Sequence, residues 1–201
     1  MRLYITRHGQ TQWNTEGRLQ GWMNSPLTPK GLERAERLRD AIRDIDFDII
    51  YSSDQYRAVK TAEIIKDGKD VEIRQIMELR EIGFGLWEGQ RLVDIKKKYF
   101  EEFNNYMTNP MKYKSCGGET IEELFDRVER GLKVIVESGG ENVLIVAHGV
   151  TIKALVTILK GLPRGTISEI DVFPGTSLSV FRKSGELWAL ELEGDTSHFH
   201  K

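Results

Sequence analysis

Two histidines and two arginines hold the positions in this sequence where chemistry is most easily explained. His148 directly follows a short apolar run and His8 follows another one residue later, and each histidine is followed by glycine. Arg7 precedes the first histidine, and Arg57 lies at the start of a predicted helix. A neutral imidazole is available as a nucleophile near pH 7, whereas a guanidinium fork matches the oxygen geometry of phosphate. Together the four side chains predict an anion site, with phosphate or a phosphate ester as the ligand.

Strands must bring these side chains together. The runs 3–6, 47–51 and 143–147 are apolar and β-prone, and the last is continuous enough for a central strand covered on both faces. Ligands of an open parallel sheet bind outside the carboxyl ends of its strands. A single histidine at a strand end is more commonly a structural hydrogen-bonding group. The convergence of two histidines and two arginines at three strand ends is what favours a binding site.

Amphipathic segments alternate with these strands and predict the helices that cover the sheet. Thr28 and Pro29 are typical of a helix start, before an apolar face that reaches Ile45. Thr120 and Glu123 form a capping box that opens another helix. The other predicted elements are a helix capped by residues 52–54, an edge strand at 71–76, a helix at 152–159, and a hairpin of strands 177–182 and 188–192. This alternation predicts an α/β protein, a three-layer α/β/α sandwich with a mostly parallel central sheet.

Residues 84–118 have weaker periodicity, and we expect them to form a small inserted helical subdomain or lid within a single domain spanning residues 1–201. Most of their large side chains are expected to pack a small core, but some could line an apolar rim above the phosphate site and set the leaving-group preference. The candidates are Phe84, Trp87, Tyr99, Phe103, Tyr106, Met107, Met111 and Tyr113, with Trp22 and Met23 from an earlier loop.

Composition limits the remaining possibilities. A net charge of −2 over 201 residues argues against a nucleic-acid or anionic-membrane binder. Cys116 is the only cysteine, and the sequence has neither a signal peptide nor a membrane-spanning run, so we expect a cytoplasmic protein. His198 and His200 are separated by one residue, a spacing that metal ligands sometimes have, but the preferred interpretation is that they lie in a mobile C-terminal tail. The oligomeric state stays open.

Five ordered blocks also resemble a known family. They are "ITRHGQTQWN", "YSSDQYRAVKTAEII", "LREIGFGLWEGQ", "GGET" and "VLIVAHGVTIKAL". They span nearly the whole chain and are similar to the histidine phosphatase superfamily, in its phosphoglycerate-mutase-like branch. The resemblance implies an α/β/α sandwich with His8 as nucleophile. It also implies two phosphate-binding arginines, a second histidine, a loop asparagine, a loop glutamine and an acid, which correspond to Arg7, Arg57, His148, Asn14, Gln20 and Glu81.

These assignments agree with a reaction that needs neither metal nor cofactor. His8 would carry the phosphoryl group, while Arg7, Arg57 and a protonated His148 would neutralise its oxygens. Asn14 and Gln20 would add amide donors, and helix N-termini such as the one at Gly149 would add backbone N–H groups. Glu81 would protonate the leaving oxygen and then activate water. From the residues alone, Glu81 could equally be a surface carboxylate paired with Arg80. The resemblance is what assigns it the role of the catalytic acid.

The predicted function is hydrolysis of a small phosphate ester through phosphohistidine. A phosphoglycerate mutase is the first alternative, although members resembling cofactor-dependent mutases generally have a longer interval than the one from Glu81 to His148. A catalytically silent phospholigand-binding module is the second alternative, and it would not need Glu81. The family commonly has Glu at the position of Gln10 and Arg at the position of Lys153. Because of these two departures, the resemblance does not assign a subfamily. The leaving group cannot be read from the sequence.

Overall fold

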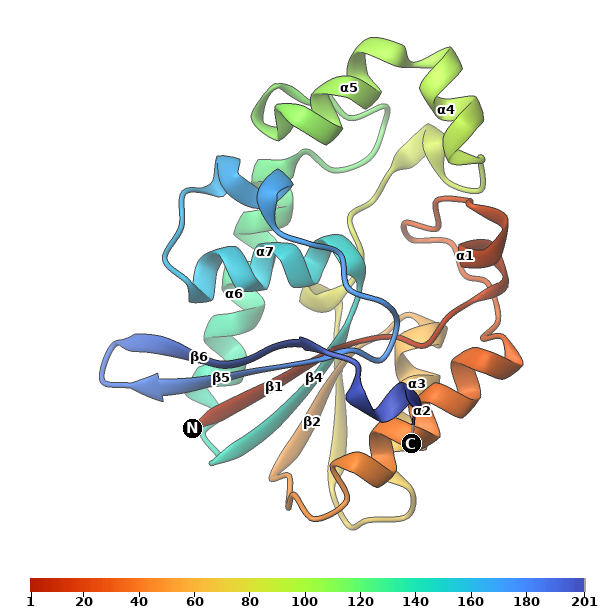
Figure 1. Cartoon of the computed structure of the whole chain (residues 1–201). Coiled ribbons are helices and arrows are strands. Elements are labelled where there is room, and N and C mark those ends of the chain that lie inside the picture. The colour runs from red at the N-terminus through yellow and green to blue at the C-terminus, as the bar shows by residue number, and fades with distance from the viewer. Residues whose placement is uncertain (201) are drawn as a thin grey trace.

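A six-stranded mixed sheet forms the centre of the molecule. The computed structural model describes residues 1–200, and the strands lie in the order β3-β2-β4-β1-β5-β6. Neighbouring strands are parallel from β3 to β1, and β5 and β6 add an antiparallel hairpin, as Figure 1 shows. The strands are β1 (Arg2–Arg7), β2 (Ile49–Ser53), β3 (Glu72–Ile76), β4 (Asn142–Ala147), β5 (Leu178–Ser184) and β6 (Leu187–Asp195). The predicted mostly parallel sheet is confirmed.

Helices cover both faces of this sheet. The α-helices are α1 (Gln12–Glu16), α2 (Pro29–Ala41), α3 (Tyr56–Lys66), α4 (Leu92–Lys98), α5 (Phe100–Thr108), α6 (Ile121–Glu137) and α7 (Gly149–Leu159). The 3-10 turns are η1 (Met77–Leu79), η2 (Gly85–Trp87), η3 (Pro110–Lys112), η4 (Arg164–Glu169) and η5 (Ser197–His200). Across residues 1–200, none of the helices has both the length and the apolar character needed to cross a membrane.

Two apolar clusters separate the three layers. Side chains alternate between the faces of a strand, so neighbouring residues in β4 enter different clusters. Leu144 packs with α2 and α3 on one face, and Ile145 packs with α6 and α7 on the other. Both side chains are fully buried. The uninterrupted apolar run in β4 therefore reflects burial on both faces, which confirms the predicted α/β/α sandwich.

The helix starts follow the expected capping chemistry in two cases and depart from it in a third. The Thr28 hydroxyl accepts a hydrogen bond from the Gly31 N–H at the start of α2, and the predicted capping box opens α6. The predicted cap at residues 52–54 is wrong, because Gln55 is the N-cap of α3 and makes no side-chain capping bond. Residues 52 and 53 instead extend the parallel ladder of β2. Helix α2 ends at Ala41, earlier than expected.

The segment 84–118 contributes α4 and α5, which lie at the top of Figure 1 away from the sheet. Its centre is Trp87, which is fully buried. The rings of Tyr99, Phe103, Tyr106 and Tyr113 surround Trp87 at centroid distances of 5.4–6.2 Å. Most of the aromatic residues therefore pack a local core.

The C-terminal turn packs onto α2, so the expected mobile tail is wrong. His198 is 2% exposed, and the guanidinium carbon of Arg34 lies 3.8 Å from the centre of the Phe199 ring. Cation–π stacking of this kind holds a terminal segment that has no helical or strand periodicity of its own. Within residues 1–200, no group of three or more His, Cys, Asp or Glu side chains is arranged to hold a metal ion.

Candidate active site

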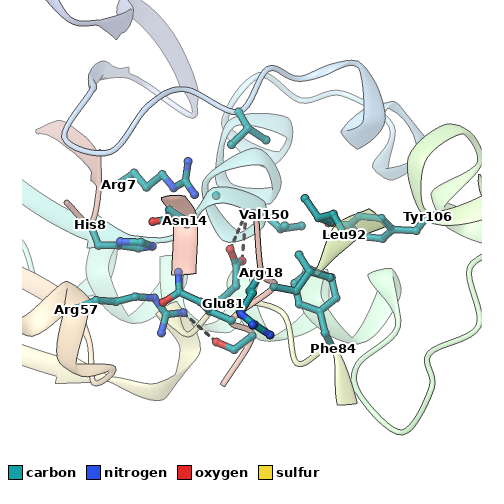
Figure 2. A pocket seen from close by; sticks show the side chains of 15 residues that line it. Arg7, His8, Asn14, Arg18, Arg57, Glu81, Phe84, Leu92, Tyr106 and Val150 are labelled. Atoms are coloured by element: carbon teal, nitrogen blue, oxygen red, sulfur yellow. Dashed lines mark hydrogen bonds between the residues drawn. The ribbon is translucent and has the colours of Figure 1, made fainter. Parts of the chain in front are cut away.

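A cavity of about 250 Å³ lies at the carboxyl end of the parallel strands. Strand β1 ends at Arg7, β2 leads into the helix that carries Arg57, and β4 leads directly into His148. Six residues that the sequence singled out line the cavity together with Gly149: Arg7, His8, Asn14, Gln20, Arg57 and Glu81. Figure 2 shows Arg7, His8 and Arg57 on one side of Glu81 and the apolar side chains of the cavity on the other.

The His8 ring is oriented by the backbone of the residue that follows it. Its Nδ1 lies 2.7 Å from the Gly9 carbonyl oxygen, and because a carbonyl can only accept, Nδ1 carries the hydrogen. Nε2 of the neutral ring is then free to attack an electrophile. The pKa of His8 lies well below 6.5, because burial and the charges of Arg57 and Arg7 disfavour the imidazolium. The structure therefore holds His8 in its nucleophilic form.

His148 lies beside His8 with a centroid distance of 5.1 Å between the two rings. It is fully buried, and neither ring nitrogen has a hydrogen-bond partner in the described residues. Burial, Arg57 and His8 lower the pKa of His148 well below 6.5. This differs from the expected protonated His148. A phosphate dianion would supply the negative charge that the imidazolium form requires.

Both arginines keep a donor that lacks an acceptor. Arg7 donates from Nη1 to the Phe173 carbonyl at 3.1 Å, and Arg57 donates from Nη1 and Nη2 to the carbonyls of Met23 and Gly21 at 2.8 and 2.9 Å. The Nε atoms of both arginines are buried without a partner among residues 1–200. Burial lowers the pKa of Arg57 to about 10, so it stays charged at neutral pH. A buried donor without a partner calls for a water or an anion, and both arginines line the cavity.

Glu81 is 8% exposed and does not pair with Arg80, whose guanidinium binds Asp54 at 2.5 Å. Its carboxylate instead caps α7. Oε1 accepts from the backbone N–H groups of Val150 and Thr151 at 3.1 and 3.2 Å. Oε2 accepts only a longer bond of 3.3 Å, from the Val150 N–H. The carboxylate is thus fixed through one oxygen, while the other retains capacity for a proton.

Two residues that sequence reasoning missed hold the chain around Glu81. Arg127 donates to the carbonyl oxygens of Glu78 and Arg80 at 2.9 Å each, and it forms a two-point ion pair with Glu119 at 2.7 and 2.8 Å. Glu119 in turn accepts from the Gly83 N–H at 2.8 Å. The available signal was an arginine inside the apolar stripe of α6, eight residues after the glutamate of the "GGET" block.

The far side of the cavity is apolar. Phe84 and Tyr106, both candidates for the predicted rim, line it, whereas Trp22 and Met23 do not. Arg18 also lines the cavity and donates to the Gly89 carbonyl at 2.8 Å. The remaining apolar members of this wall are Leu19, Leu92, Val150 and Val172. A leaving group that extends past Glu81 would therefore meet apolar side chains and one arginine.

The site geometry and the whole-chain comparison agree on a family. The sequence profile of the histidine phosphatase superfamily (branch 1) matches residues 3–196. This chain belongs to that superfamily. As a histidine phosphatase it is an enzyme, and its first family block carries His8 at the end of β1.

Relatives of this histidine phosphatase carry two kinds of name. It is 38% identical over 161 residues to a putative phosphoserine phosphatase 2 of Hydrogenobacter thermophilus, covering 80% of this chain and 79% of the relative. It is 35% identical to a probable phosphoglycerate mutase GpmB of Salmonella paratyphi A, covering 98% of this chain and 94% of that one. The solved structure of Bacillus stearothermophilus YhfR is similar with a TM-score of 0.94, at 37% identity and 98% coverage of both chains.

Proposed function

We propose that this histidine phosphatase hydrolyses a small phosphate monoester through a covalent phosphohistidine on Nε2 of His8. One observation carries the proposal. The hydrogen bond of 2.7 Å between Nδ1 of His8 and the Gly9 carbonyl fixes the tautomer, so that Nε2 has its lone pair available in a cavity with two arginines. The low pKa of His8, caused first by burial, keeps that lone pair available below neutral pH.

In the first half-reaction, Nε2 of His8 forms a bond to phosphorus and the ester P–O bond breaks. The leaving oxygen takes a proton from Glu81, and Oε2 is the oxygen with capacity to hold that proton. In the second half-reaction, Glu81 removes a proton from water, whose oxygen attacks phosphorus. The N–P bond then breaks, and inorganic phosphate leaves with the His8 lone pair restored.

Charge on the transferring group would be met by protein donors, so we propose that the reaction needs no metal ion. The unpartnered Nε donors of Arg7 and Arg57 support this role, and the two buried ring nitrogens of His148 add a further donor once phosphate charge is present. Asn14 and Gln20 line the same cavity and would donate amide N–H groups to the phosphate oxygens. The Gly149 N–H belongs to the first turn of α7 beside them.

The substrate that we propose is a small molecule, with residues 84–118 acting as a lid on a single domain of residues 1–201. The apolar wall with Phe84 and Tyr106 supports a leaving group larger than a methyl ester. A net charge of −2 and the single Cys116 are compatible with a cytoplasmic enzyme that does not bind nucleic acid. Phosphoglycerate mutase is the alternative, and the 35% identical relative of that name favours it.

Rapid-quench trapping with a radiolabelled aryl phosphate tests the proposal. We expect an acid-labile, base-stable phosphoenzyme in the wild type and none in His8→Ala. Turnover after exhaustive chelation should equal turnover before it. A phosphoenzyme in the His8 variant would contradict the mechanism, and loss of turnover on chelation would contradict the metal-free reaction. Conversion of 3-phosphoglycerate to 2-phosphoglycerate faster than phosphate release would decide for the mutase.

A further inference from the structure

A second polar cavity, also of about 250 Å³, lies beside the catalytic one. It is lined by Arg7, Gln10, Asn14, Arg34, Pro174 and Gly175. Two of these residues, Arg7 and Asn14, line both cavities, so their side chains separate the two spaces. None of the lining residues is acidic. The second cavity therefore brings two positive charges together with no carboxylate in its wall.

Hydrogen bonds orient both amides in this wall in the same sense. The Oδ1 atom of Asn14 accepts from the Thr11 backbone N–H at 3.0 Å, which identifies it as the oxygen. The Oε1 atom of Gln10 accepts from the Thr28 hydroxyl at 3.0 Å. Each amide oxygen is thus occupied, and each NH₂ group remains to donate. The cavity presents donors from two amides and two guanidinium groups.

Arg34 is fixed in this wall by stacking instead of by an ion pair. Its guanidinium carbon lies 3.8 Å from the centre of the Phe199 ring. Among residues 1–200, no salt bridge joins Arg34 to an acidic side chain, although Arg37 on the same helix pairs with Glu33 at 2.7 Å. A stacked guanidinium keeps its in-plane N–H donors available for an oxyanion.

We propose that this cavity is a second oxyanion subsite, which binds a phosphate group beside the catalytic phosphate. Gln10 and Arg34 are its distinguishing residues, and neither takes part in the phosphohistidine chemistry. Two sources present the same ligand chemistry: free inorganic phosphate, and the second phosphate of a bisphosphorylated ester. In both cases the ligand accepts N–H bonds from the two amides and from Arg34, while Arg7 contributes charge to both sites.

Side-chain ¹⁵N NMR with inorganic phosphate as the probe tests the subsite. We expect saturable shifts of the Arg34 Nε–H and Gln10 NH₂ signals, with a dissociation constant on the order of 1 mM. Gln10→Glu places a carboxylate in the wall and should weaken this binding at least about tenfold, as should Arg34→Gln. Arg43→Gln removes one exposed positive charge from outside the cavity and serves as the matched control.

The two phosphate sources are separated by inhibition with 1,3-propanediol bisphosphate and with propyl phosphate. Tighter inhibition by the bisphosphate, lost in Gln10→Glu, supports a second phosphate on the same molecule. Equal inhibition together with the Arg34 shift supports free phosphate. Absence of a saturable shift at Arg34 and Gln10, or shifts that both variants leave intact, overturns the subsite. Shifts of the His8 ring report the catalytic site separately, so failure of one site does not decide the other.

Discussion

Replacing Arg127 by methionine removes a cation whose partners all surround Glu81. The guanidinium is bound by both oxygens of Glu119 and by the carbonyls of Glu78 and Arg80, with side-chain exposures of 11% for Arg127 and 16% for Glu119. Removal of one partner from a buried pair costs about 3–5 kcal/mol, because the other charge stays buried. For a chain of this length, that cost lowers the melting temperature by roughly 10 °C.

The same change should affect catalysis selectively. General acid catalysis contributes about 10²–10⁴-fold, and a displaced Glu81 carboxylate would lose part of this. We expect the kcat/KM of Arg127→Met to fall about 10- to 100-fold with glycerol 2-phosphate, whose leaving alkoxide needs a proton. With p-nitrophenyl phosphate, whose leaving phenolate needs none, the fall in kcat/KM should be only a few-fold, because kcat/KM reports formation of the phosphohistidine and not its hydrolysis. Glu81→Gln should show the same dependence on the leaving group.

A second variant separates stability from positioning. Arg127→Met combined with Glu119→Leu removes the orphaned charge, so thermal unfolding should show that much of the lost stability returns. The selective defect with glycerol 2-phosphate should persist, because the carbonyls of the segment before Glu81 remain without their donor. Equal losses of kcat/KM on both substrates in Arg127→Met would refute the reasoning. So would a double variant that recovers full activity with the alkyl ester.

Three further outcomes can be measured. The buried His8 and His148 stay neutral in the folded protein but protonate in the unfolded chain. The free energy of unfolding should therefore decrease as pH falls below 6.5, by about 1 kcal/mol per pH unit for each histidine. A pH-independent urea midpoint between pH 6.5 and 5 would contradict their burial as neutral groups. Gly175→Ala places a Cβ 2.6 Å from the His8 carbonyl oxygen and should lower kcat about tenfold, whereas Gly165→Ala, with its nearest contact at 3.6 Å, should not. Phe84→Ala should raise KM about tenfold for naphthyl phosphate and little for glycerol phosphate, and an equal change in both would remove Phe84 from the leaving-group wall.

The architecture could be predicted from the sequence because each of its central elements has a residue pattern typical of either a strand or a helix. Strand β4 is a continuous apolar run, and α6 combines a capping box with an apolar stripe. The end of β2 was missed because Ser52 and Ser53 look like helix caps. Both serines are fully buried, and their backbone groups belong to the ladders with neighbouring strands. Pairing across the sheet outweighed the local preference of serine.

Parts of the candidate site depend on contacts that no local pattern encodes. The family resemblance identified Glu81, but the sequence did not show that its carboxylate caps α7, whose first residues come 68 or more positions later. Arg127 donates to backbone carbonyl groups, and because every residue has one, the residue types at positions 78 and 80 do not reveal these contacts. The tail that carries His198 was expected to be mobile for a related reason. The C-terminal turn docks with a contact between Phe199 and Arg34, and a single contact produces no periodic pattern in the sequence.

The order of strands in the sheet also determines when this enzyme can first become active during synthesis. Strand β1, which leads into His8, precedes the other five strands in the sequence, yet its two neighbours in the sheet are β4 and β5. Those partners are residues 142–147 and 178–184, so β1 must wait for almost the entire chain to leave the ribosome. An arrested nascent chain that ends before β5 therefore has an unpaired edge next to its nucleophile. His8 can therefore reach its working position only after these later strands have been made.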